Sequence, residues 1–348
     1  MPAPRIATRR RFAAVGTAAL LAMPPVAAAQ APPAAASPAS RTRQAVPRTA
    51  DGKPDLQGVW SFATVTPLER PVELGNKAVL TEAEAAEFEK ASAQRNNRDT
   101  NVPEGNVGDY NNFWYDRGTS VLGNRRTSLI VDPPDGRIPA LTPEAQRHVE
   151  AIAAARRGLG TDEPTPGGFV EDLGPGGLRV RCILGFNSGP PMTPGAYNNH
   201  VQIFQTPTLV ALHNEMVHNA RMVPLDGRPH LPQTVRQWVG DSRGRWEGDT
   251  LVVETRNFLR ETNFRNSGPR LQLVEKFTRL DADTLQYDFT VTDPTTWTRP
   301  WTASVLMTRS ADPLYEYACH EGNYGMFGIL GGAAEPSAAG SATAPRSK

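Results

Sequence analysis

The stretch LQLVEKFTRLDADTLQYDFTVT (residues 271–292) predicts a β-hairpin. In its second half, apolar and polar residues alternate, with the apolar ones at Leu285, Tyr287, Phe289 and Val291. This alternation is typical of a strand that packs one face and exposes the other. Asp281-Ala282-Asp283 favours a turn between the two halves. The stretch therefore indicates an antiparallel sheet over a single core.

Segments of similar composition lie on both sides of this hairpin. With the hairpin's own strands, they are residues 201–205, 208–215, 221–225, 234–241, 250–257, 271–279, 285–292, 301–309 and 314–319. Most of their connections are as short as hairpin turns, which predicts an antiparallel meander. A long meander usually closes into a barrel or stacks into a sandwich, because closure removes exposed edges. We therefore expect a mainly β domain whose sheet closes into a barrel or stacks into a sandwich, with a few peripheral helices.

Two helices are expected before the meander. Thr81 and Glu84 match a capping box ahead of residues 83–93. Thr142-Pro143-Glu144 favours a second helix start, and Gly158 and Gly160 favour its end. Both helices are short, so we expect them at the periphery. Residues 50–180 are then an irregular and helical part, and residues 181–330 are the β meander.

The first 29 residues have the order of a signal peptide. Four arginines without an acidic residue precede an apolar run over 12–22, and Ala27-Ala28-Ala29 offers a cleavage site. Residues 8–12 (TRRRF) match the twin-arginine export consensus, with an ordinary secretory signal as the alternative. No later stretch is long and apolar enough to span a membrane. We expect a periplasmic or secreted protein.

Charge and composition limit the possible partners of the mature chain and the extent of its folded part. Loss of the four signal-peptide arginines lowers the formal net charge from +1 to −3, which argues against nucleic acid as a partner. Residues 30–49 are rich in Ala, Pro and Ser, and residues 331–348 in Gly, Ala, Ser and Pro. Such segments bury too little apolar area to fold, so we expect a disordered linker and tail. The folded domain is expected over 50–330.

Cys182 and Cys319 are the two cysteines of the chain. In an oxidising compartment, an isolated pair is more often bonded than free. We expect a disulfide between them.

Three segments resemble a widespread group of exported bacterial proteins. They are GKPDLQGVW (52–60), DSRGRWEGDTL (241–251) and YACHEGNY (317–324). The resemblance covers most of residues 50–330 and implies no particular activity. The Gly58-Val59-Trp60 opening followed by a meander also resembles lipocalin-like barrels. That second likeness implies a cupped barrel with an internal ligand site.

The segment from His213 to His218 contains three groups that could bind a metal or move a proton. On a regular strand, His213 and Glu215 share a face and His218 points away. Joint metal binding would need a bulge, and the helical H-E-x-x-H spacing is absent. We therefore predict no cofactor, and a divalent metal at this segment is the alternative. A further interpretation is that these three residues are simply solvent-facing or hydrogen-bonded strand residues.

The expected disulfide would bring a second set of polar residues to this segment. It ties Cys319, and the His320-Glu321 pair that follows it, to the loop ending at His200. We therefore expect one cavity with Glu215, His218 and His320 as its acid-base residues. The residues expected to bind substrate there are Tyr197, Asn199, Arg221, Asp241, Arg243 and Glu321.

Three further motifs have simpler interpretations. Gly240-Asp241-Ser242-Arg243-Gly244 matches G-x-S-x-G, but no helix follows it, so a turn or bulge is favoured over a nucleophilic serine. His230 is a looser site candidate. Most of the tryptophans are expected to pack in the core. The Phe113-Trp114-Tyr115 cluster, in a polar stretch, is the one expected to face a ligand.

The residues favour an acid-base enzyme, a lyase, isomerase or hydrolase, acting on a small organic or saccharide substrate. They contain no nucleotide-binding fingerprint or P-loop. One alternative is a lipocalin-like protein that binds a small molecule without chemistry. The other is a metal-dependent enzyme that uses the same histidines.

Overall fold

Ten strands form one antiparallel sheet in the computed structural model, which describes residues 45–100, 111–159, 177–262 and 264–324. These residues all belong to the unit Arg43–Lys348. The strands are β1 (Gly58–Ser61), β2 (Ile130–Asp132), β3 (His200–Gln205), β4 (Leu209–Asn214), β5 (Ala220–Pro224), β6 (Asp241–Glu247), β7 (Thr250–Arg256), β8 (Gln272–Arg279), β9 (Thr284–Thr292) and β10 (Trp301–Ser310).

Several expected segments fall outside the described residues. These are the signal peptide (1–29), most of the linker (30–49) and the tail (331–348). Within the described ranges, no helix has the length and apolar character needed to cross a bilayer.

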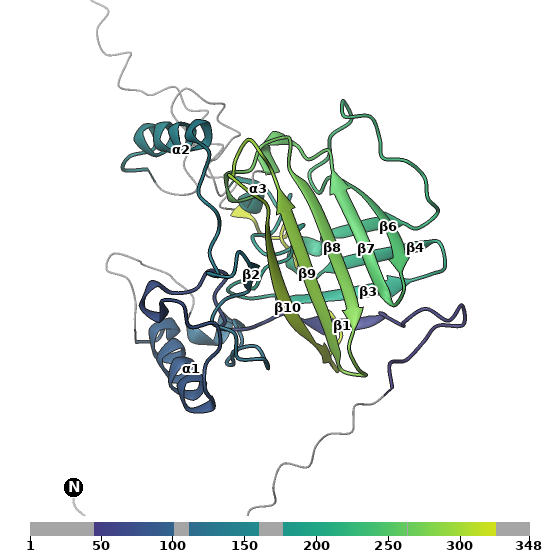
Figure 1. The fold of residues 1–348 in the computed structure, drawn as a ribbon, viewed down its shortest axis with the longest axis horizontal. Coiled ribbons are helices and arrows are strands. Elements are labelled where there is room, and N and C mark those ends of the chain that lie inside the picture. Colours follow the sequence, from purple (N-terminus) through teal and green to yellow (C-terminus); the bar gives the residue numbers. More distant parts are fainter. Residues whose placement is uncertain (1–44, 101–110, 160–176, 263, 325–348) are drawn as a thin grey trace, which may run out of the picture. The chain divides into compact units, whose positions relative to one another are not determined.

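Two meanders build the sheet, which confirms the expected mainly antiparallel β fold. β3–β5 form one meander and β6–β10 the other, and β1 joins them by pairing with both β3 and β10. The short β2 pairs with β10. In Figure 1, β1, β3 and β4 pass behind β8, β9 and β10, so the sheet is strongly curled. Its edges are β5 and β6, and hydrogen bonds do not close it into a barrel.

The two edges nevertheless pack against each other through side chains. A Cβ atom on Gly244 of β6 would lie 2.8 Å from a methyl group of Val223 on β5 and 2.5 Å from one of Leu225. Only a residue without a side chain allows so close an approach. Gly244 therefore lets the sheet curl almost shut.

Aromatic and aliphatic side chains fill the inside of this curl. The expected inward residues of β9 are all fully buried, and Trp60, Phe277 and Trp301 join them. The Phe277 and Tyr287 rings lie 4.9 Å apart between centroids. The space that a lipocalin-like barrel would offer to a ligand is occupied here by core side chains.

A network of three buried polar side chains crosses the core. Arg221 of β5 donates hydrogen bonds to both carboxylate oxygens of Glu275 on β8. Tyr287 donates its hydroxyl to the same carboxylate at 2.7 Å. Burial is the largest single effect and lowers the pKa of Arg221, but the charge of Glu275 and its hydrogen bonds with Arg221, together with Tyr287, outweigh burial and raise that pKa.

Two expected strands are not formed. Residues 234–240 form turns and one isolated bridge, between Gln237 and Phe258, and only Asp241, the start of β6, pairs in a ladder. Residues 231–237 are exposed, so no packed face favours extended pairing there. Residues 314–319 also lack a ladder partner. Conversely, a turn or bulge was expected at residues 240–244, but residues 241–244 lie within strand β6, which pairs with β7.

Both expected helices are present. α1 (Glu82–Asn96) has the full Thr81–Glu84 capping box, and α2 (Pro143–Ala155) is capped by the Thr142 hydroxyl. A four-residue helix, α3 (Gly177–Val180), was not expected. Short 3₁₀ turns are η1 (Val72–Leu74), η2 (Asn112–Trp114), η5 (Met216–His218), η6 (Arg260–Thr262) and η7 (Phe264–Asn266).

Candidate functional site

The β3–β4 hairpin places His200 opposite Glu215. Val201 pairs with Asn214, and the backbone N–H of Glu215 donates to the carbonyl of His200 at 3.0 Å. Directly opposed residues in an antiparallel pair project from the same face. The His200 Nδ1 and Glu215 Oε2 atoms accordingly lie 3.1 Å apart.

Three carboxylates act on the His200 imidazole. Its pKa is raised above the ordinary value of 6.5, first by the hydrogen bond to Glu215, against an opposing effect of burial. The negative charges of Glu215, Asp116 and Asp312 raise it further. The imidazole side chain is 23% exposed and the Glu215 side chain 10%, so the pair is partly shielded but reachable.

His200 and Glu215 lie on the wall of a cavity of about 640 Å³. His200 pairs with Ser61, and both alternate with residues buried inside the curl, so the cavity lies on the outer face of the sheet. Its other lining residues are Phe113, Trp114, Tyr115, Asp116, Tyr197, Asn198, Ser310, Asp312, Pro313, Tyr315 and Tyr317.

Exposed aromatic rings dominate these walls. Phe113 is 84% exposed, Trp114 59% and Tyr315 68%. The rings of Tyr115 and Tyr197 meet edge-on at 6.2 Å between centroids. The Phe113-Trp114-Tyr115 cluster therefore lines a cavity, as expected for residues that face a ligand.

Buried amides hold the loop that leads into His200. Asn199 is fully buried; its Nδ2 donates to the Asp116 carbonyl at 2.5 Å and its Oδ1 accepts from the Gly195 N–H at 2.7 Å. Asn187 Nδ2 donates to the carbonyls of Tyr197 and Asn198. These bonds link the segment around Asp116 to the loop that bears Tyr197, so two walls of the cavity are fixed together.

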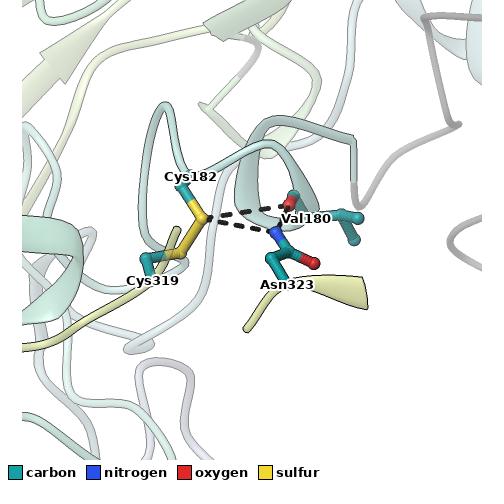
Figure 2. The surroundings of a disulfide bond; sticks show 4 residues. All are labelled: Val180, Cys182, Cys319 and Asn323. Carbon is teal, nitrogen blue, oxygen red and sulfur yellow. Dashed lines mark hydrogen bonds between the residues drawn. A yellow bond between two sulfur atoms is a disulfide. The ribbon is translucent and has the colours of Figure 1, made fainter. Parts of the chain in front are cut away.

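The disulfide fixes the third wall. Cys182 and Cys319 are bonded, with their Cα atoms 5.8 Å apart, which confirms the expected bridge. As Figure 2 shows, the bond lies beside Asn323, whose Nδ2 donates to the Val180 carbonyl at 3.1 Å. The segment just before Cys319 contains Tyr315 and Tyr317 and forms no strand, so the disulfide anchors this wall.

The structure brings only part of the expected acid-base set to the cavity. Glu215 and Tyr197 line it. His218 lies just beyond, with its ring 6.5 Å from that of Tyr317. His320 and Glu321 follow the disulfide as exposed residues and are not among those lining the cavity.

The other expected substrate-binding residues have structural partners. Arg221 is bound to Glu275 in the core, and Asn199 lies beneath the cavity wall. Asp241 accepts from Arg243 Nη1 at 2.6 Å, and its second oxygen lies 2.8 Å from His230 Nδ1.

Ser242 lies next to Asp241 on β6, where it is buried. Its hydroxyl lies 2.9 Å from that of Thr255. This placement favours a structural serine over a nucleophile.

The sequence interpretation named His200 only as a loop residue. Its role follows from hairpin register: the expected strands 201–205 and 208–215 are joined by a short turn at Thr206 and Pro207. Counted outward from that two-residue turn, His200 would lie opposite His213, but the structure pairs Gln205 with Val210, and this register places His200 opposite Glu215. The expected strand bounds therefore did not identify Glu215 as the partner of His200, because the connection between the paired ends is two residues longer than expected.

His213 lies near the site and is affected by His218. The pKa of His213 is lowered by burial and by the nearby His218. Among the residues with described positions, no group of three or more His, Cys, Asp or Glu side chains has the arrangement of a metal site.

Comparison of the chain with protein-family models, with curated proteins and with solved structures finds no match.

Proposed function

We propose that the protein is an acid-base enzyme, a lyase, isomerase or hydrolase, and that His200 and Glu215 exchange protons with a small organic substrate in the aromatic cavity. The observation that carries the proposal is the 3.1 Å pairing of His200 Nδ1 with Glu215 Oε2 on the cavity wall. An imidazole oriented by a carboxylate is a common general acid and base.

In this reaction each residue of the pair has its own task. Glu215 accepts a hydrogen bond from Nδ1 and stabilises the imidazolium. Nε2 is then the nitrogen that takes a proton from the substrate or returns one to it. Because the pKa of His200 is raised, Nε2 is a stronger base than an isolated imidazole nitrogen, and it serves as an acid below that pKa.

A binding protein without catalysis is the second candidate. The exposed faces of Phe113, Trp114 and Tyr315 favour it, because such rings bind apolar and cyclic molecules without further chemistry. This candidate uses the same cavity on the outer face of the sheet.

The experiment uses 5-nitrobenzisoxazole, an aromatic ring that opens after one proton abstraction and releases a coloured phenolate. We expect the purified protein to open it faster than buffer does. His200→Gln should lower that rate by about 10² or more, because it removes the base. The matched control is His148→Gln, an exposed histidine of α2, which should leave the rate unchanged.

Binding is measured in parallel through quenching of tryptophan fluorescence, to which Trp114 contributes from the cavity wall. Quenching together with equal ring-opening rates for wild type and His200→Gln would overturn the enzymatic proposal and support the binding protein.

The compartment in which this chemistry takes place is proposed to be the periplasm or the exterior. The disulfide between Cys182 and Cys319 supports it, since such bonds persist in oxidising compartments. The twin-arginine route belongs to the same proposal.

A further inference from the structure

The charged side chains that line the cavity are of one sign apart from His200. Asp116, Glu215 and Asp312 supply three carboxylates. Among the described residues, no lysine or arginine lines this cavity. Even with His200 protonated, the lining charge is negative, so the cavity attracts cations and repels anions.

The three carboxylates act on the same region of space. All of them raise the pKa of His200 through their charge, so each lies close enough to influence a group held beside that imidazole. A positive group near His200 would experience the same three charges.

The walls add a second attraction of the same sign. Six aromatic residues line the cavity: Phe113, Trp114, Tyr115, Tyr197, Tyr315 and Tyr317. Aromatic faces are negative and attract cations within about 6 Å of the ring centre. The Tyr115 ring shows this affinity within the protein itself, since the guanidinium carbons of Arg117 and Arg98 lie 4.4 Å and 5.5 Å from its centroid.

From these two features we infer that the cavity selects organic cations, molecules in which an ammonium-type group adjoins an apolar or ring portion. The inference rests on the proposed site and names the substrate class of that site. Aromatic rings bind the apolar portion and the faces of the cation, and the carboxylates supply the countercharge. A neutral molecule of the same shape would gain only the apolar contacts.

The test compares three ligands by isothermal titration calorimetry. Phenyltrimethylammonium is the cation, tert-butylbenzene its uncharged isostere and benzenesulfonate a ring of opposite charge. We expect the cation to bind about tenfold more tightly than the isostere, from cation–π contacts and the carboxylates together. Benzenesulfonate should bind most weakly.

Two variants separate the sources of this selectivity. Asp312→Asn should weaken cation binding about two- to fivefold. Its fold should be unaffected, because the backbone of Asp312 rather than its carboxylate makes the hydrogen bonds to Ser310. Tyr315→Leu should weaken binding of the cation by about the same factor and leave binding of the isostere unchanged. Glu87→Gln, at an exposed residue of α1, is the control and should change nothing.

The outcomes distinguish this inference from the proposed enzyme. Equal affinities for the cation and the isostere would overturn cation selection, whatever the ring-opening assay shows. The protein could bind the cation selectively while its His200→Gln variant opens 5-nitrobenzisoxazole at the wild-type rate. That result would support the inference and overturn the proposed enzymatic function. Tighter binding of benzenesulfonate than of the cation also contradicts the inference.

Discussion

Arg221 on β5 and Glu275 on β8 form a salt bridge through both carboxylate oxygens, with side chains 4% and 0% exposed. These strands are far apart along the sheet, so the pair connects opposite sides of the curl. The fold depends on both partners of a buried ion pair being present, because removing one leaves an uncompensated charge in the core.

Arg221→Met should therefore destabilise the fold by about 3–5 kcal/mol. Adding Glu275→Met should recover much of that loss, because the unpaired carboxylate is then gone. Urea unfolding of both variants, with midpoints and slopes compared to wild type, checks this. A single variant that loses less than about 1 kcal/mol would show that the pair is not needed.

The sequence predicts the strands of this fold better than their arrangement. Alternation identifies the buried face of β9 residue by residue, because burial on one face imposes a period of two. Nothing local in β1 indicates that it lies between β3 and β10. Pairing between segments so far apart depends on the whole core and not on local pattern.

The site residues divide in the same way into those that the sequence predicts and those that depend on tertiary structure. Glu215, Tyr197 and the Phe113-Trp114-Tyr115 cluster were expected at a ligand site and line the cavity. Arg221 was expected at the site from its polarity alone, but the sequence does not show that Glu275, at a distant position, faces it. The partner of a buried charge is a tertiary feature, so its role cannot be predicted from type and position.

The disulfide provides a second prediction. The protein labelled with an alkylating reagent without reductant should gain no mass, because both thiols are bonded. Replacing both cysteines by serine should cost about 2–5 kcal/mol, since the closed loop spans a separation of 137 residues. It should also weaken ligand binding, because the wall with Tyr315 and Tyr317 loses its anchor. Two labelled cysteines in the exported protein would contradict the structure.

Gly244 provides a test of the curl. Gly244→Ala would place a methyl group against Val223 and Leu225, and we expect a loss of about 1–3 kcal/mol from overpacking. Gly123→Ala is the matched control, because no heavy atom lies within 4 Å of its added Cβ and its φ is not positive. Thermal unfolding of both variants measures the difference. Equal midpoints would show that the edges do not pack so closely.

Export is tested through Arg9 and Arg10 of the expected twin-arginine signal. Changing both to Lys should retain precursor in the cytoplasm, because that pathway requires the arginine pair. Immunoblots of periplasmic and cytoplasmic fractions provide the measurement. Undiminished periplasmic accumulation would indicate an ordinary secretory route instead.

The last prediction concerns the pH dependence of His200. Its folded-state pKa lies above the unfolded value near 6.5, chiefly through the hydrogen bond to Glu215 and against the effect of burial. A group whose pKa is raised by folding stabilises the native state fully below its unfolded pKa. That contribution is lost as pH rises through the folded pKa.

The stability advantage of wild type over His200→Gln should thus be largest at about pH 5 and shrink as pH rises. Urea unfolding of both proteins across that range measures it, and NMR titration of the His200 ring gives its pKa directly. Glu215→Gln should lower that pKa, since it removes the nearest charge, with Asp116 and Asp312 remaining. The rate of 5-nitrobenzisoxazole opening should rise over the pH interval in which the NMR titration shows His200 losing its proton. A rate that rises elsewhere would assign the base to another residue, even if the stability profile behaves as expected.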